Sequence, residues 1–250
     1  PTVLCFHGEP SWSYLYRHML DPLVASGQRV VCPDLVGFGR SDKPTDLRWY
    51  SYDRHVDVVS RHLSRLDLRD LTVVVQDWGG PIGLRWAVEN EPRVAGLVIL
   101  NTGLYAGRVS GGFMRWREFV ERTPDLPIGM IVQAGSRTEL DAGVVGAYEA
   151  PFPTPESKAG AASFPLLVPI RDDDPGAAEM IAVREALRRW TKPALVCFSD
   201  GDPIVPYPVS GQAFTELIPG AGEQVRIEDA AHFLQEDRGP QIVATMLEAR

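Results

Sequence analysis

The sequence predicts an α/β protein with a mostly parallel, doubly wound sheet and a helical segment inserted between two of its strands. Short apolar runs alternate with longer amphipathic stretches, the pattern of repeated strand–helix units. The runs are rich in β-branched residues and are bounded by Gly, Pro or Asp, as strands buried on both faces require. The expected strands are Val3–Phe6, Arg29–Cys32, Thr72–Gln76, Gly96–Asn101, Ala194–Ser199 and Glu223–Ile227.

The amphipathic stretches between these runs predict the helices that cover the sheet. The expected helices are Ser13–Ala25, Tyr52–Leu66, Gly80–Asn90, Ala177–Trp190, Pro208–Leu217 and a last one from about Gly239 to Leu247.

The alternation stops over residues 103–175. Helical patterns, scattered aromatic residues and the proline-rich joint Pro151–Pro155 replace clear strands there, and the regular pattern resumes at Ala177. We therefore expect a helical cap over the carboxyl ends of the strands. The expected domains are a core of residues 1–102 and 176–250 and a cap of residues 103–175.

Composition and charge exclude some classes of function. The 250 residues contain no run of 18 apolar residues, so no membrane-spanning helix is expected. The net charge of −8 argues against nucleic-acid binding, because such binding needs a basic surface to neutralise phosphates.

The cysteines and the amino terminus are informative about the cellular location of the protein. Cys5, Cys32 and Cys197 each lie in or beside an apolar run and lack metal-ligand spacing. They are expected to be buried, reduced thiols, which fits a cytoplasmic location. Because Pro1 stands directly before a strand expected to be buried, we expect the natural chain to begin further upstream, where any signal peptide would lie.

A strand, a sharp turn and a helix follow one another around Asp77. The strand Thr72–Gln76 leads into Asp77, and a helical pattern follows after Gly80. This is the nucleophile-elbow pattern G-x-S-x-G with aspartate in the serine position, in which Gly79 is the small residue after the nucleophile and Val75 replaces the earlier glycine. Taken alone, the aspartate would equally suit a helix N-cap.

A late acid and a later histidine argue against the N-cap alternative. Asp200 and Asp202 follow the strand Ala194–Ser199, and His232 follows the last strand. The order nucleophile, acid, histidine is that of the α/β-hydrolase fold. We predict a catalytic triad of Asp77, Asp202 and His232, and prefer Asp202 to Asp200 because it leads directly into the next apolar stretch.

The aspartate nucleophile indicates the type of reaction. Serine attacking a saturated carbon would form an ether, which water does not reopen. A carboxylate forms an ester, which an activated water hydrolyses. Asp77 therefore indicates displacement at a saturated carbon that carries a halide or an epoxide oxygen.

Four segments of the chain resemble the haloalkane dehalogenases, and the resemblance spans essentially all 250 residues, cap included. The family has further strands ahead of the one that opens this chain, in agreement with the expected upstream segment. The matching segments are His7–Arg17, Asp34–Pro44, Val75–Gly80 and Ala231–Glu236.

The resemblance implies a halide site with two N–H donors. Trp78 follows the nucleophile, and Trp116 occurs in the context Phe-x-x-Trp-x-x-Phe of the subfamily with two halide-binding tryptophans. The other subfamily has Asn where this chain has Glu9, and carries its acid one strand earlier, where this chain has Asn101. An indole N–H suits an anion in an apolar cavity because it donates without a competing acceptor.

The resemblance also implies an oxyanion hole and a pocket wall. The backbone N–H groups of Glu9 and Trp78 would stabilise the oxyanion during ester hydrolysis. The candidate wall residues would equally suit plain core packing. They are Phe113, Phe152, Phe164, Pro165, Val168 and Ile204.

The expected reaction converts a small haloalkane and water into an alcohol, a halide ion and a proton. No Cys/His cluster or phosphate loop occurs, so neither a metal nor an organic cofactor is expected. We expect the protein to be a monomer. The nearest alternative is an epoxide hydrolase, for which Tyr105 and Tyr148 are candidate acids. A non-catalytic ligand receptor of the same fold is a further alternative.

Overall fold

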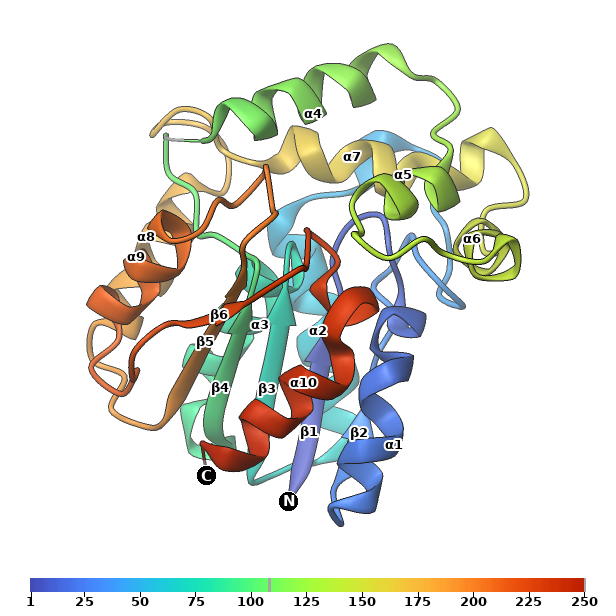
Figure 1. The fold of residues 1–250 in the computed structure, drawn as a ribbon. Helices are drawn as coiled ribbons and strands as arrows, with labels where there is room; N and C mark the ends of the chain where they lie inside the picture. Colours follow the sequence, from blue (N-terminus) through green and yellow to red (C-terminus); the bar gives the residue numbers. More distant parts are fainter. Residues whose placement is uncertain (108, 250) are drawn as a thin grey trace.

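The computed structural model describes residues 1–107 and 109–249, which form one sheet with helices on both faces (Figure 1). The strand order is β2-β1-β3-β4-β5-β6, and every neighbouring pair is parallel. The strands are β1 (Thr2–Phe6), β2 (Arg29–Val31), β3 (Leu71–Gln76), β4 (Val94–Leu100), β5 (Ala194–Ser199) and β6 (Val225–Ile227).

Helices cover both faces of the sheet because its central strands carry apolar side chains on both sides. Helices α1 and α10 pack together on one face, and α2, α3 and α8 pack on the other (Figure 1). The core helices are α1 (Arg17–Ala25), α2 (Tyr52–Leu66), α3 (Gly79–Glu89), α8 (Ala177–Leu187), α9 (Val209–Leu217) and α10 (Leu234–Glu248). Short 3-10 helices lie at Ser13–Tyr16, Leu47–Trp49, Glu91–Arg93 and Pro155–Lys158.

Four helices between β4 and α8 lie over the carboxyl ends of the strands, at the top of Figure 1. We call them the cap. They are α4 (Gly111–Arg122), α5 (Ile128–Ala134), α6 (Ala142–Glu149) and α7 (Ala159–Leu167). The loops that follow the parallel strands therefore end beneath the cap, which is where ligands bind in open α/β sheets.

The structure confirms the predicted α/β-hydrolase fold and its parallel sheet, with differences at the ends of elements. The last helix begins at Leu234, five residues before the expected start at Gly239. The backbone at Arg238 is non-helical, and Pro240 follows it. Because a proline in a helix removes a hydrogen bond and crowds the preceding turn, the sequence pattern marked only the part beyond this kink.

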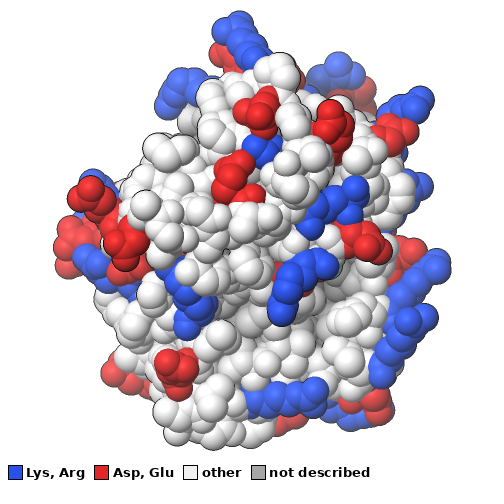
Figure 2. All heavy atoms as spheres, turned by 90° about the vertical axis from the view of Figure 1, so that its right-hand side faces the viewer, with Lys and Arg blue, Asp and Glu red and all other residues white. Residues whose placement is uncertain are grey.

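The surface carries both signs of charge. Figure 2 shows the face on the right of Figure 1, where basic and acidic side chains are interspersed. Within residues 1–107 and 109–249, no helix is long and apolar enough to cross a membrane.

Candidate active site

Asp77 stands at a strained turn between β3 and α3. Its φ angle is 48°, in the left-handed region that few non-glycine residues adopt, and its backbone N–H donates to the Asn101 carbonyl at 3.0 Å. A Cβ on Gly79 would lie 2.1 Å from the carbonyl oxygen of Phe6, so only glycine fits there. The turn thus raises the Asp77 carboxylate above the sheet, as a nucleophile elbow does.

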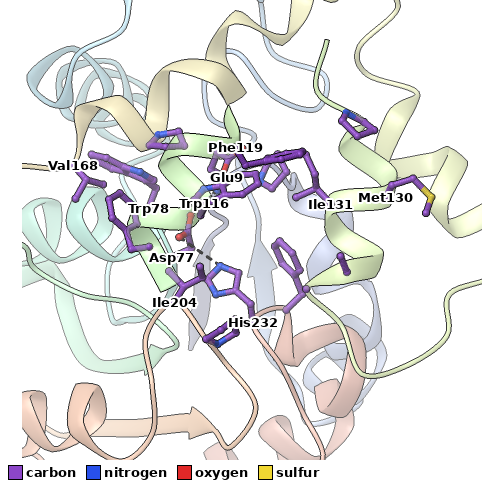
Figure 3. Close-up of a pocket in the computed structure, with 18 of the residues that line it drawn as sticks. Glu9, Asp77, Trp78, Trp116, Phe119, Met130, Ile131, Val168, Ile204 and His232 are labelled. Carbon is purple, nitrogen blue, oxygen red and sulfur yellow. Dashed lines mark hydrogen bonds and ion pairs between the residues drawn. The ribbon is translucent and has the colours of Figure 1, made fainter. Parts of the chain in front are cut away.

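His232 lies in the loop between β6 and α10 and links two carboxylates. Its Nδ1 is 2.7 Å from Asp202 Oδ2, and its Nε2 is 3.6 Å from Asp77 Oδ2 (Figure 3). The other oxygen of Asp202 accepts hydrogen bonds from the backbone N–H groups of Ile204, at 2.7 Å, and Val205, at 3.2 Å. Asp202 is therefore fixed and orients the imidazole.

The two carboxylates control the charge of His232. Burial alone would lower its pKa, but Asp202 and then Asp77 outweigh burial and raise the pKa to about 10. The imidazole is therefore protonated near neutral pH while both carboxylates are charged. Loss of the charge on Asp77 would lower the pKa of His232.

Asp200 lies outside this arrangement. Its carboxylate pairs with Arg226 at 3.0 Å near the surface, and this hydrogen bond lowers its pKa. Of the two candidate acids, the structure brings only Asp202 to the histidine.

The turn after β1 approaches Asp77 from the other side. The backbone N–H of Glu9 donates to Asp77 Oδ1 at 2.7 Å. A Cβ on Gly8 would lie 2.3 Å from the same oxygen, so the approach requires glycine. His7 holds the turn, because its Nε2 accepts from the Leu35 N–H at 2.9 Å.

A cavity of about 420 Å³ lies between Asp77 and the cap. Trp78 and Trp116 both line it, the first from the elbow and the second from α4 (Figure 3). Of the predicted wall residues, four line it: Phe113, Pro165, Val168 and Ile204.

Phe152 and Phe164, the other two predicted wall residues, are not among the residues that line this cavity. Phe164 stacks on Trp78 with ring centroids 4.8 Å apart and on Phe38 at 5.1 Å. Phe152 packs edge-on against Phe38 at 6.3 Å. These rings are buried, and the stack that begins at Trp78 continues through Phe164 to Phe38.

The two candidate tyrosine acids lie in different places. Tyr148 is fully buried, and its hydroxyl contacts Glu236 and Arg17 at the junction of α6, α10 and α1. Tyr105 lines the cavity, where burial and then the charges of Asp77 and Asp202 raise its pKa. The structure therefore offers no pair of cavity tyrosines from these two residues.

Several cavity residues were not assigned to the wall from the sequence. Phe119, Met130 and Ile131 line the cavity from α4 and α5 (Figure 3), and Phe233 follows the histidine. An apolar residue at a helical period is expected to pack in a core, so the sequence held no signal for these positions. Gln76 was also missed; its side-chain nitrogen is 3.2 Å from His232 Nε2.

No cluster of three or more metal-ligating side chains occurs among the described residues.

The fold and the triad geometry define an α/β-hydrolase, and a family model described as the alpha/beta hydrolase fold matches residues 1–239. Curated relatives indicate which family of α/β-hydrolases the chain resembles. Haloalkane dehalogenase 1 of Mycobacterium tuberculosis (strain H37Rv) is 48% identical over 99% of this chain and 83% of its own length. Haloalkane dehalogenase of Psychrobacter cryohalolentis is 43% identical over 98% of this chain and 82% of its own length.

A solved structure gives the same result. Haloalkane dehalogenase DpaA from Paraglaciecola agarilytica NO2 superposes with a TM-score of 0.94 at 33% identity, covering 100% of this chain and 83% of that one. The chain belongs to the haloalkane dehalogenases, hydrolases that act on carbon–halide bonds.

Proposed function

We propose that this chain hydrolyses small haloalkanes through an alkyl ester on Asp77. One carboxylate oxygen attacks the halogen-bearing carbon in line, the carbon–halogen bond breaks, and the halide leaves with the bonding electrons. The observation that carries the proposal is the placement of the Asp77 carboxylate, which faces an apolar cavity and lies between the Glu9 N–H and the His232–Asp202 pair.

Trp78 and Trp116 are proposed to hold the departing halide with their indole N–H groups. Both line the cavity that Asp77 faces, and neither nitrogen offers an acceptor that would repel an anion. In such an apolar, partly buried site, donors already in place stabilise a growing charge more than fully water-exposed donors do. Halide is a weak base, so its departure needs no proton transfer.

His232 is proposed to act as the base in the second half of the reaction. Formation of the ester removes the negative charge of Asp77, which lowers the pKa of His232, so the imidazolium releases its proton to solvent and the neutral imidazole can then take a proton from water. The resulting hydroxide attacks the ester carbonyl, and the oxyanion is stabilised by the N–H groups of Glu9 and Trp78. Collapse of the intermediate breaks the bond to the alkoxide, which takes the hydroxyl proton and leaves as the alcohol; the Asp77 carboxylate is restored, and His232 keeps the proton taken from water, as in the resting enzyme.

The size and chemistry of the cavity support small, apolar substrates. About 420 Å³ is at the small end of ligand pockets, and most of its wall is aromatic or aliphatic. Short haloalkanes therefore fit better than bulky or charged halogenated compounds.

The first experiment measures bromide release from 1,2-dibromoethane and 1-bromobutane. Wild type should release bromide, and Asp77→Ala should lose all detectable release. Asp202→Asn should lose activity by at least about 100-fold, since the imidazole loses its orienting partner. The matched control is Asp200→Asn, which should retain wild-type activity because Asp200 pairs with Arg226.

Styrene oxide hydrolysis, run alongside, tests the alternative reaction. An epoxide oxygen leaves as a strong base and needs an acid, and Tyr148 is hydrogen-bonded away from the cavity. Epoxide turnover without bromide release from the folded protein would overturn the proposal. No detectable turnover of either substrate class would favour a non-catalytic ligand receptor.

The expectation of a monomer has no support from the relatives, since the solved structure of DpaA is tetrameric. Sedimentation or light scattering of the purified protein measures its oligomeric state. The three cysteines are free, and on that basis we keep a reducing, cytoplasmic location as a proposal.

A further inference from the structure

The side chain of Glu9 has no part in the mechanism above, although its backbone N–H does. The residue is only 4% exposed, and it lines the same cavity as Trp78 and Trp116. Its Oε1 atom is buried and has no hydrogen-bond partner among the described residues. A buried polar atom on a cavity wall is costly unless a ligand or water completes its bonding.

The surroundings of this carboxyl favour its neutral form. Burial raises the pKa of Glu9 well above its ordinary value, and the charge of Asp77 raises it further. His232 and the side chain of Trp116 act in the opposite direction and do not compensate. Tyr105 is the remaining titratable group on the wall, and no lysine or arginine occurs among the described residues that line it.

The two protonation states of Glu9 would affect a halide in opposite ways. A neutral carboxyl donates an O–H, as the indole of Trp116 donates its N–H, whereas a carboxylate repels an anion. Glu9 lines the same cavity as Trp78 and Trp116, the two donors that are proposed to hold the halide. Figure 3 shows Glu9, Trp116 and Asp77 converging on one side of the cavity.

We propose that the protonated carboxyl of Glu9 is a third leaving-group donor, which hydrogen-bonds the halide beside Trp78 and Trp116, and that its ionisation weakens halide binding. No bond to hydrogen breaks in the displacement step: the proton stays on Glu9 while the halide departs. This inference rests on the proposed halide site.

The test compares bromide binding to wild type, Glu9→Gln and Glu9→Leu between pH 6 and 10, followed by quenching of tryptophan fluorescence. Glutamine keeps an N–H donor and does not ionise, so its affinity at pH 6 should lie within about threefold of wild type. Leucine removes the donor and should weaken binding about 10-fold at pH 6. The bromide affinity of wild type should fall more steeply toward alkaline pH than that of Glu9→Gln. Both proteins retain Asp77 and His232, so a difference between their pH profiles reports on Glu9.

Two results would overturn the inference. One is an identical pH profile for wild type and Glu9→Gln, which would mean that Glu9 does not titrate against the halide. The other is unchanged bromide affinity in a folded Glu9→Leu variant, with circular dichroism as the check on folding. Bromide release by wild type is measured in parallel: if it is absent, the proposed function fails, whereas normal release with either result above removes only the role of Glu9.

Discussion

At the scale of single residues, the charge of His232 depends on Asp77. The two carboxylates raise the pKa of this imidazole to about 10 against the effect of burial. Asp77→Asn keeps the shape and removes one of the two charges, so the pKa of His232 should fall by about 1 to 3 units. The measurement is an NMR titration of the histidine ring protons in both proteins.

An unchanged pKa for His232 in Asp77→Asn would contradict the proposed order of events, in which formation of the ester turns the imidazole into a base.

A second residue-scale prediction concerns Gly8. Its missing side chain lets the β1 turn approach Asp77, because a Cβ would lie 2.3 Å from Asp77 Oδ1. Gly8→Ala should therefore displace the Glu9 N–H from that oxygen and reduce kcat for 1-bromobutane by roughly 100-fold, the effect of losing one oxyanion donor.

Gly27→Ala is less suitable as a control because its φ is 82°, so we choose Gly143→Ala, where no atom lies within 4 Å of the added Cβ. The control should keep wild-type kcat. A Gly8→Ala variant with full activity would show that the close approach of this turn is not needed for the reaction.

The residues that could be predicted from the sequence are those fixed by local backbone. Asp77 follows β3 directly and His232 lies in the loop after β6, so strand prediction alone placed both at the same edge of the sheet. The wall of the cavity could not be predicted in the same way. Phe164 and Ile131 are both apolar residues on short cap helices, yet the first is buried against Trp78 and the second lines the cavity, because helix packing decides which side each one presents.

At the scale of elements, the cap is tied to the loop that carries the histidine. Asp237 on α10 accepts backbone N–H groups from Arg137 and Thr138, between α5 and α6, at 2.7–3.0 Å. The same carboxylate accepts the Ala231 N–H at 2.9 Å, one residue before His232. The cap loop and the catalytic loop therefore share one anchor.

Asp237→Ala should leave three backbone N–H groups without their acceptor. We expect a loss of roughly 2–4 kcal/mol in the free energy of unfolding, measured by urea denaturation, together with a lower kcat because the loop of His232 loosens. Glu139→Ala, on the exposed surface of the same cap loop, is the matched control and should change neither quantity. Equal stability of the two variants would contradict the anchor.

The element boundaries show the same limit on sequence prediction. The expected start of the last helix at Gly239 missed the segment from Leu234, because Pro240 and the non-helical Arg238 interrupt the helical pattern. That missed turn contains Asp237 and Glu236, which bind the cap. Long-range contacts of this kind hold an irregular segment in place and leave no periodic signal in the sequence.

At the scale of the whole molecule, the active site should make folding stability depend on pH. In the folded protein the pKa of His232 is about 10, whereas an unfolded histidine has its ordinary value of 6.5. Between these values the folded state binds more protons than the unfolded state, so stability from this group is fully present below pH 6.5 and is lost as pH rises through about 10. Glu9 acts in the same direction, because its raised pKa also lets the folded state retain a proton that the unfolded state releases.

Urea denaturation at pH 6.5, 8 and 9.5 tests this in wild type, His232→Gln and the exposed control His62→Gln. Wild type and His62→Gln should lose stability in parallel as pH rises. His232→Gln should show a shallower slope, by at most about 1.4 kcal/mol per pH unit, the effect of one proton. Asp77 and Asp202 lose their shared cation in His232→Gln, so this variant should be less stable than wild type at pH 6.5. The difference in stability between the two proteins should shrink toward pH 9.5. Parallel lines for all three proteins would mean that the catalytic imidazole does not bind its extra proton in the resting enzyme, which would contradict the proposal that ester formation turns His232 into a base.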